Sequence, residues 1–572
     1  MSDCLCFNIV RNKPGWRVLL ATSVERLAMV RILSSLIFGF AVLVLLLSAC
    51  QALANSQSRP NIVFVLADDL GIGDVKCCGG DRCQIETPGF DRLAREGMLF
   101  SDAHTAASVC VPARIAMMTG RYPWRFTSPR PDGPWGFLNP RLKTDQMTLG
   151  RLLQSAGYRT GYIGKWHLGT LMPTLDGHNQ GPANVDYSKP LITGPQQYGF
   201  DESFILPGSL DMYPYAFARN NVWQGRVTAQ KGWSAFNRIG PAAEDFEDVK
   251  VLDTFSTEAK QFVARQAEDA RTGKPFFLYL ALTSPHTPVS PSAKFEGKSR
   301  LGIYGDFVME TDDCLKRVLA SLDQHGLAEN TLVIASSDHG PALYAGRRKE
   351  ATPNQLRELE KDGHYSSGIY RGYKFSIYEG ALRVPFLVRW PGVVKAGLRC
   401  DQLIAQQDLM RTFADICSVE LSSDEAPDSI SFLPLLKGTD VSTRQTMILQ
   451  STERYAVRDG NWKLALCPGS GCKGQFGNEP ASLAAWTEAR RIFGKAATRA
   501  DLSAAPFVQL FDLSNDPGES QNLAAEQPER IQRMIGILQN QISRGRCTPG
   551  PSLENDGQID YLRGVPGFVF AK

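Results

Sequence analysis

The chain has 572 residues, too many for one ordinary hydrophobic core, so we expect one large and one small domain. Its formal charge of +3 is close to neutral for this length, and no basic run interleaved with aromatic residues indicates a nucleic-acid partner. Thirteen irregularly spaced cysteines fit neither a disulfide scaffold nor a zinc-ligand framework. We expect at most one or two short bridges, such as Cys467 with Cys472.

An almost wholly apolar segment at residues 32–47 follows Arg31. A helix of this length rises about 24 Å, short of the roughly 30 Å hydrocarbon core of a bilayer, so the segment predicts a secretory signal rather than a permanent anchor. Residues 1–54 are therefore read as a leader, and Met29, with Arg31, begins a compact basic region that suits a true start.

Two ways of processing this signal remain open. Ala52-Leu53-Ala54 suits ordinary signal peptidase, whereas residues 47–50 resemble a bacterial lipoprotein box in which Cys50 becomes the lipidated first residue. Both predict an exported chain, located in the periplasm, on the outer membrane as a lipoprotein, or outside the cell. Contact with a membrane is expected only through the signal or a lipid at Cys50.

Apolar, β-branched runs alternate with helical stretches after this leader. Such runs are typical of buried parallel strands. The predicted strands cover residues 61–67, 160–164, 276–282, 331–337 and 384–388. The predicted helices cover residues 149–156, 253–268 and 305–324. This order predicts an α/β domain over residues 59–437, with a mostly parallel, mixed sheet flanked by helices.

The pattern of predicted secondary structure changes at about Gly438. Short strands and turns follow, and the chain then enters an amphipathic helical stretch at residues 528–543. We expect residues 438–572 to form a small antiparallel-sheet subdomain with a terminal helix.

Ionisable residues gather just beyond the predicted strand ends. Asp68-Asp69, His286 and Asp338-His339 each follow a different strand, and such ends converge on the ligand crevice in open α/β sheets. Adjacent carboxylates are costly to bring together unless a cation intervenes. Calcium takes several oxygen ligands, so a hard divalent ion is the expected partner of these aspartates.

Three further motifs carry nucleophilic or cationic groups. Cys110-Val111-Pro112-Ala113-Arg114 is followed shortly by Thr119-Gly120-Arg121, and Pro112 suits the first turn of a helix. Cys110 is therefore expected at the positive end of that helix, where an anion would be held. Residues 164–169 read Gly-Lys-Trp-His-Leu-Gly, and residues 371–385 contain Lys374.

Together these motifs resemble the type I sulfatases of the alkaline-phosphatase-like superfamily, over about residues 59–523. Within that family the chain looks like the arylsulfatases and N-acetylgalactosamine-6-sulfatases. The resemblance implies that a sulfatase-maturing enzyme oxidises Cys110 to formylglycine (3-oxoalanine), whose hydrated aldehyde is the nucleophile. It also implies one calcium ion, Ca²⁺, bound by Asp68, Asp69, the modified Cys110, Asp338 and His339. His339 stands where many relatives have Asn, and imidazole is a softer ligand than calcium usually prefers.

The same resemblance assigns the catalytic roles. The implied catalytic set is Cys110, Arg114, Lys165, His167, His286 and Lys374. Its cations surround the developing negative charge with the metal, an arrangement that usually dominates catalysis. His286, with Lys374, is implied to protonate the leaving oxygen, and His167 to take the proton from the second hydroxyl of the hydrate.

The function that these residues predict is hydrolysis of a sulfate ester, either a sulfated saccharide or a small aryl sulfate. Two alternatives remain open: a phosphoester or phosphonate ester hydrolase of the same superfamily, and an inactive exported carbohydrate-binding protein. Aromatic-rich loops at residues 209–215 and 223–233 are suited to stack on sugar faces, which favours a sulfated sugar.

Overall fold

The computed structural model describes residues 59–127, 131–439, 441–452, 454–472 and 508–562. The predicted signal at residues 32–47 and Cys50 lie outside these ranges. None of the helices within them has both the length and the apolar character needed to cross a membrane.

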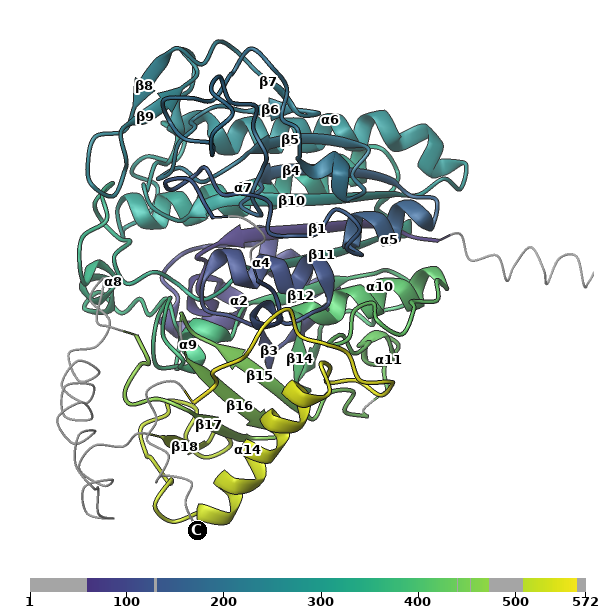
Figure 1. Cartoon of the computed structure of the whole chain (residues 1–572), viewed down its shortest axis with the longest axis vertical. Helices are drawn as coiled ribbons and strands as arrows, with labels where there is room; N and C mark the ends of the chain where they lie inside the picture. Colours follow the sequence, from purple (N-terminus) through teal and green to yellow (C-terminus); the bar gives the residue numbers. More distant parts are fainter. Residues whose placement is uncertain (1–58, 128–130, 440, 453, 473–507, 563–572) are drawn as a thin grey trace, which may run out of the picture. The chain divides into compact units, whose positions relative to one another are not determined.

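A ten-stranded mixed sheet forms the centre of the fold (Figure 1). Its strands, in spatial order, are β13 (Leu398–Cys400), β2 (Met98–Phe100), β12 (Phe386–Arg389), β11 (Thr331–Ser337), β1 (Asn61–Asp68), β10 (Phe276–Pro285), β4 (Arg159–Lys165), β5 (Glu202–Leu206), β6 (Ala218–Arg219) and β7 (Val222–Trp223). The middle of the sheet is parallel: β1 pairs with β10 and β11, and β4 pairs with β10 and β5. The predicted α/β sheet is therefore confirmed.

One predicted strand begins later than expected. The sequence predicts residues 384–388, whereas β12 begins at Phe386 and runs antiparallel to both β11 and β2. Pro385 has no N–H to donate to a sheet ladder, so regular pairing starts only after it.

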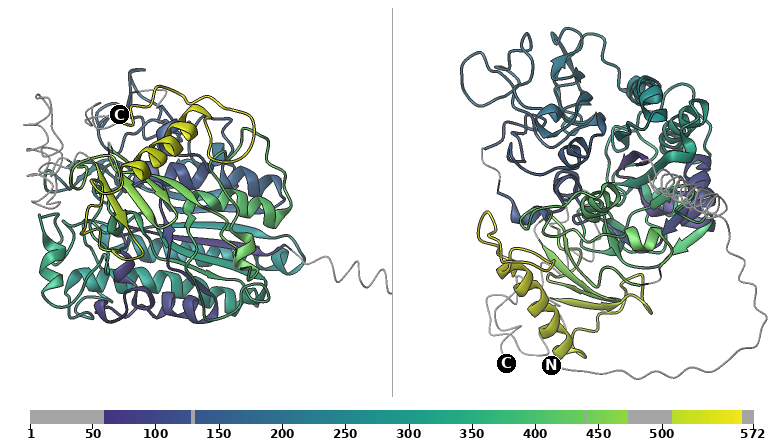
Figure 2. Two further views of the ribbon diagram at one scale, coloured as in Figure 1. Left: turned by 90° about the horizontal axis from the view of Figure 1, so that it is seen from below. Right: turned by 90° about the vertical axis from the view of Figure 1, so that its right-hand side faces the viewer.

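Helices cover both faces of the sheet (Figure 2). The helices of one face are α3 (Pro88–Glu96), α6 (Val251–Arg271) and α7 (Ile303–Gln324). Those of the other are α4 (Cys110–Thr119), α5 (Leu149–Ser155) and α10 (Leu409–Cys417). Short helices α2 (Lys76–Gly79), α8 (Gln355–Glu360), α9 (Glu379–Leu382) and α11 (Leu433–Leu436) lie in the connections. Small two-stranded sheets pair β3 (Ala103–His104) with β14 (Ile404–Ala405), and β8 (Ala229–Lys231) with β9 (Gly240–Ala242).

A four-stranded antiparallel sheet follows, as the sequence predicts. It consists of β15 (Thr446–Gln450), β16 (Tyr455–Asp459), β17 (Trp462–Ala465) and β18 (Gln509–Asp512). Helix α14 (Pro528–Ser543) buries Ile531, Met534, Ile535 and Leu538 in an apolar cluster with residues of this sheet. The cluster also contains Ala116 of α4, so it connects the small sheet to the helix that carries Cys110.

The expected bridge between Cys467 and Cys472 is wrong. Both are free cysteines. The sulfur of Cys467 packs closely against the backbone of Gly471. A Cβ added to Gly471 would lie only 2.8 Å from this sulfur. The sulfur of Cys472 instead contacts the hydroxyl of Ser470 at 3.3 Å.

A buried charge network connects the small sheet to helix α9. The Glu379 carboxylate is fully buried and accepts hydrogen bonds from Arg383 Nη2 at 2.8 Å and Lys463 Nζ at 2.9 Å, and it contacts His104 Nε2 at 2.7 Å. Glu519 accepts the backbone N–H of Glu379 at 2.6 Å and lies 2.8 Å from Lys463 Nζ. Because Lys463 belongs to β17, the small sheet supplies part of the charge that keeps Glu379 ionised.

We predict that Glu519 makes stability fall as pH rises from about 4.5 to about 7. Burial and the neighbouring Glu379 raise the pKa of Glu519 from its ordinary 4.5 to about 7. The folded protein therefore keeps a proton that the unfolded chain loses above pH 4.5. The resulting stabilisation, of order 3 kcal/mol at most, is complete below that pH and is lost as pH rises towards 7.

Chemical unfolding of the wild type and Glu519→Gln at pH 5 and pH 7.5 measures this effect. The variant should lose much less stability between the two pH values than the wild type does. Glu526→Gln, which removes an exposed carboxylate nearby, should behave like the wild type. An unchanged pH dependence in Glu519→Gln would show that other groups are responsible.

Candidate active site

The register of the three central strands brings the polar strand ends together. Asp68, the last residue of β1, lies opposite Pro285 of β10, and the preceding Ala67 lies opposite Ser337 of β11. The residues that follow these strands, Asp69, His286 and Asp338, therefore meet at one edge of the sheet. Asp69 follows β1 with a left-handed φ of 63°. Its own N–H donates to Asp338 Oδ1 at 3.1 Å.

Helix α4 brings a thiol and a guanidinium to the same edge. Cys110 is its first residue, as predicted, and Arg114 lies one turn later on the same face. The Arg114 guanidinium donates to Asp338 Oδ2 through Nε at 3.2 Å and Nη2 at 3.0 Å. It also donates to the carbonyl of Lys165 at 3.3 Å, which connects the helix to the end of β4.

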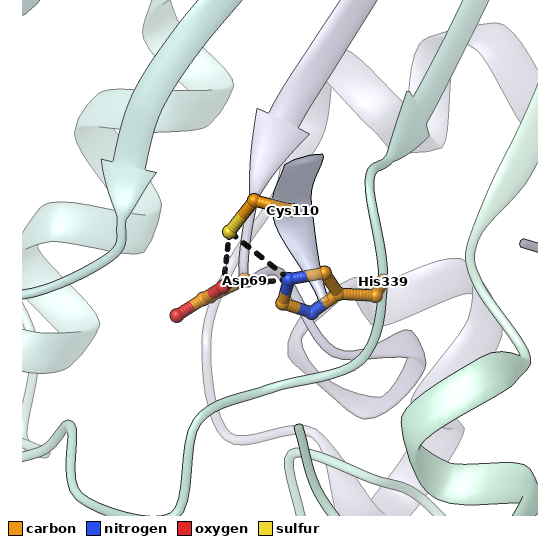
Figure 3. Close-up of side chains that lie close together, drawn as sticks. All are labelled: Asp69, Cys110 and His339. Atoms are coloured by element: carbon orange, nitrogen blue, oxygen red, sulfur yellow. Dashed lines mark hydrogen bonds and ion pairs between the residues drawn. The ribbon is translucent and has the colours of Figure 1, made fainter. Parts of the chain in front are cut away.

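Cys110 lies at the centre of the cluster. Its Sγ lies 3.3 Å from His339 Nε2, 3.4 Å from Lys374 Nζ, 3.7 Å from Asp68 Oδ1 and 4.0 Å from Asp69 Oδ1. Figure 3 shows Asp69 and His339 pointing toward this sulfur from different connections. The side chain of Cys110 is therefore surrounded by cations, carboxylates and an imidazole.

Each buried carboxylate has its own cation. Lys165 Nζ lies 2.6 Å from Asp68 Oδ2, and Lys374 Nζ lies 2.8 Å from Asp69 Oδ1, while Arg114 pairs with Asp338 as described. The sequence-based argument that three carboxylates would repel one another without a metal is therefore incomplete. Three negative and three positive side chains balance within the cluster, so the protein alone can hold the carboxylates together.

Burial and pairing set the protonation states. Burial opposes ionisation of Asp68, but Lys165, His286 and Arg114 outweigh it and hold its pKa well below the usual value. The pKa of Asp69 is lowered too, because Lys374 is among the cations that outweigh its burial. Conversely, burial raises the pKa of the Cys110 thiol well above its ordinary value, although Lys165 and Lys374 oppose that rise. The unmodified thiol is therefore neutral.

The three histidines of the site present different nitrogen atoms. His339 Nδ1 contacts the carbonyl of Gly340 at 2.9 Å, which favours a proton on Nδ1 and leaves a lone pair on Nε2 facing Cys110. Burial lowers the pKa of His339, so it is neutral. His286 Nδ1 contacts the carbonyl of Thr287 at 2.5 Å, and its Nε2 lies 3.7 Å from Asp69 Oδ2.

His167 is buried beside the cations of the site. Burial, then Lys165 and Arg114, lower its pKa well below the ordinary value. Its Nδ1 has no hydrogen-bond partner among the described residues. A buried neutral imidazole with an unused nitrogen can accept a proton.

The donor set fits a hard cation. Two groups of three donors share Cys110, one with Asp69 and His339 and the other with Asp68 and Asp338, and the donor atoms within each group lie within 4.8 Å of one another. Carboxylate oxygens predominate, as calcium requires, and His339 offers the single nitrogen. The structure thus gathers all the residues predicted from sequence for the site and the metal, while their roles remain predictions.

Sequence reasoning did not identify Asp211 as part of this neighbourhood. Its carboxylate is almost completely buried, and Oδ1 lies 3.9 Å from His286 Nδ1. Asp211 belongs to one of the aromatic-rich loops, but a lone Asp in a loop carries no motif. Only the folded arrangement places it beside His286.

Comparison with known proteins identifies close similarity to one enzyme family. The family model described as Sulfatase matches residues 60–419. The chain is 31% identical to an N-acetylgalactosamine-6-O-sulfatase of Bacteroides thetaiotaomicron, over 85% of this chain and 93% of that protein. It is 29% identical to human steryl-sulfatase, over 86% of this chain and 89% of that protein.

A solved structure shares the fold over nearly its whole length. It comes from work on the metabolism of multiple glycosaminoglycans by Bacteroides thetaiotaomicron. It matches this chain with a TM-score of 0.70 and 29% identity, and the match covers 85% of this chain and 99% of that one.

We predict that Lys165→Met destabilises the protein when divalent cations are removed by a chelator. The substitution keeps the length of the side chain but leaves the Asp68 carboxylate buried without its nearest cation. Breaking such a buried pair typically costs about 3–5 kcal/mol. Chemical unfolding measures the loss.

Lys189→Met is the matched control, because Lys189 is 65% exposed and pairs with Asp186 at the surface. Its stability should be close to that of the wild type, since surface pairs contribute little. An equally small loss for Lys165→Met would refute the view that the carboxylates depend on their cations.

Proposed function

The chain belongs to the sulfatase family and hydrolyses sulfate esters, and we propose that it does so through an oxidised Cys110 and one calcium ion, with a sulfated saccharide as substrate. The observation that carries the proposal is the position of Cys110, whose sulfur lies within 4.0 Å of two carboxylates, an imidazole and an ammonium group.

The protonation state of the Cys110 thiol argues against an unmodified cysteine as the nucleophile. A cysteine nucleophile acts as a thiolate, but burial raises the pKa of this thiol and keeps it neutral. Formylglycine at this position would supply a hydroxyl nucleophile from its hydrated aldehyde. A sulfatase-maturing enzyme is the partner that this modification requires, and Cys110, Pro112 and Arg114 form the expected recognition pattern.

The carboxylate-rich donor set supports calcium. Asp68, Asp69 and Asp338 would hold the ion together with the modified Cys110, and His339 would offer its Nε2. Such an ion polarises the oxygens of the reacting group. Because the protein charges of the cluster balance, adding the ion leaves a site of net positive charge that favours an anionic sulfate ester.

The protein's own side chains would manage the protons and the charge. Arg114, Lys165 and Lys374 stabilise negative charge that develops on the sulfate oxygens. His286 is suited to protonate the leaving oxygen through Nε2, because its Nδ1 is already bonded to a backbone carbonyl. His167, neutral and with Nδ1 unused by the described residues, is suited to accept a proton.

Relatives favour a sugar as the group that carries the sulfate. The Bacteroides relative that shares 31% identity is an N-acetylgalactosamine-6-O-sulfatase, and the matching solved structure concerns glycosaminoglycan metabolism. We therefore propose a 6-sulfated N-acetylgalactosamine unit as the substrate.

The export signal predicted from the sequence agrees with this choice of substrate. Sulfated polysaccharides are extracellular, so the signal at residues 32–47 would bring the enzyme to them, either through signal peptidase or through a lipid at Cys50.

We predict formylglycine at Cys110 in protein made with a sulfatase-maturing enzyme. Mass spectrometry of the peptide that contains Cys110 detects it. Cys110→Ala should fold but show no activity, whereas Cys400→Ala, which changes a partly exposed cysteine of edge strand β13, should remain active. A fully active preparation with only unmodified Cys110 would refute the mechanism. Faster turnover of 4-nitrophenyl phosphate than of 4-nitrophenyl sulfate would instead favour a phosphoester hydrolase.

We predict that His286→Ala damages turnover of sugar sulfates far more than turnover of 4-nitrophenyl sulfate. A sugar alkoxide needs protonation as it leaves, and general acid help is typically worth about 10²–10⁴-fold, whereas nitrophenolate leaves readily without it. Steady-state kinetics on both substrates measure the difference. His178→Ala, which removes an exposed histidine, is the control. Equal losses on both substrates would mean that His286 only positions the sulfate.

A further inference from the structure

Three loops lie beside the histidines of the active site. Residues 131–141 contact the segment after His167, because Thr170 N–H donates to Leu138 O at 3.0 Å. Residues 207–215 begin at Pro207, whose carbonyl accepts the N–H of His167 at 3.1 Å. The hairpin tip at residues 232–240 lies beside the other two loops. Its Arg238 contacts Asp211 of one loop and Trp135 of the other.

Asp211 places an unused acceptor in this neighbourhood. The residue is 2% exposed, and Oδ2 accepts a hydrogen bond from Arg238 Nη1 at 2.9 Å. Oδ1 has no hydrogen-bond partner among the described residues and lies 3.9 Å from His286 Nδ1, which is already bonded to a backbone carbonyl. A buried carboxylate oxygen without a donor is costly, so it indicates a place for a ligand's O–H or N–H.

Arg238 connects this acceptor to an exposed aromatic ring. Its guanidinium carbon lies 3.5 Å from the centre of the Trp135 ring, and Trp135 is still 53% exposed. Trp135 also has a left-handed φ of 51°, which is strained for a bulky side chain. Residues in such strained conformations are found mainly at active sites and ligand-binding sites. One guanidinium therefore fixes both a flat apolar surface and a carboxylate acceptor.

Most of the aromatic residues expected to stack on sugars are less accessible. Tyr213, Tyr215 and Trp223 of the two aromatic-rich loops are all buried. Tyr213 packs against Phe137 with ring centres 5.5 Å apart, and Trp223 packs against Tyr187 at 5.3 Å. The prediction of sugar stacking therefore does not apply to these three side chains. Trp233, at the end of the second loop, is 44% exposed, but its ring lies 4.9 Å from Lys349 Nζ rather than in the contacts that join Arg238 to Asp211.

We propose that Trp135, Arg238 and Asp211 form the subsite for the sugar ring that carries the sulfate. This inference rests on the function proposed above, since it concerns the leaving-group side of the same site. The exposed surface of Trp135 stacks on the apolar face of the ring. Asp211 Oδ1 accepts a hydrogen bond from a ring hydroxyl or the acetamido N–H, and Arg238 holds both groups at a fixed spacing.

Kinetics on N-acetylgalactosamine 6-sulfate, combined with inhibition by inorganic sulfate, test the subsite. Trp135→Ala should lower kcat/KM for the sugar sulfate about tenfold, and Asp211→Asn about tenfold or more, mainly through KM. Both should leave the inhibition constant of inorganic sulfate within about twofold of the wild type, because sulfate alone does not reach the subsite. Trp135→Phe should recover much of the loss.

Trp462→Ala is the matched control. Trp462 also carries a stacked arginine, with Arg530 4.0 Å from its ring centre, but it lies on β17 of the small sheet. This variant should keep wild-type kinetics, and thermal unfolding of every variant reports its folding.

Two results would overturn the subsite alone: unchanged kcat/KM for the sugar sulfate in folded Trp135→Ala and Asp211→Asn, or an equal weakening of inorganic sulfate. A wild-type enzyme that hydrolyses 4-nitrophenyl sulfate but no sugar sulfate would instead refute the proposed substrate class, and the subsite with it. Wild-type activity on neither ester would contradict the proposed chemistry itself.

Discussion

The pairing of each buried carboxylate with its own cation is the interaction on which the rest of the site depends. Asp68, Asp69 and Asp338 come from two neighbouring strand ends, and burial alone would raise the pKa values of Asp68 and Asp69. Lys165, Lys374 and Arg114 arrive from β4, a loop and α4 and pair with the three carboxylates, and the pKa values of Asp68 and Asp69 are lowered as a result. An ionised cluster can hold a cation and present positive charge to an anion, which a protonated cluster cannot do.

Sheet register and one helix explain why these groups meet. Parallel pairing of β1 with β10 and β11 aligns three strand ends, and the buried β-branched runs of those strands make that pairing predictable from sequence. Helix α4 then adds Cys110 and Arg114 from the same face, because four residues separate them. The chemistry therefore follows from local patterns, and the loops determine which molecules can approach it.

The limits of sequence-based prediction follow the same division. The strands and the helix at Cys110 were predictable because they rest on periodicity and local spacing, whereas the grouping of all the motif residues followed from the resemblance to the sulfatases. Asp211, Arg238 and Trp135 were not predictable, because each comes from a separate loop and only the folded contacts join them. The bridge between Cys467 and Cys472 failed for a related reason: short spacing brings two sulfurs near each other but does not orient them.

The network around Glu379 has a consequence for how such an enzyme can be divided. Glu379 lies five residues after Lys374, and Lys463 and Arg458 of the small sheet neutralise its buried carboxylate. A gene cut between the large and small sheets would therefore separate the segment that carries Lys374 and Glu379 from the counter-charges of Glu379. Recombination among relatives could exchange the loops of the proposed sugar subsite, whereas the buried network requires the two sheets to be inherited together.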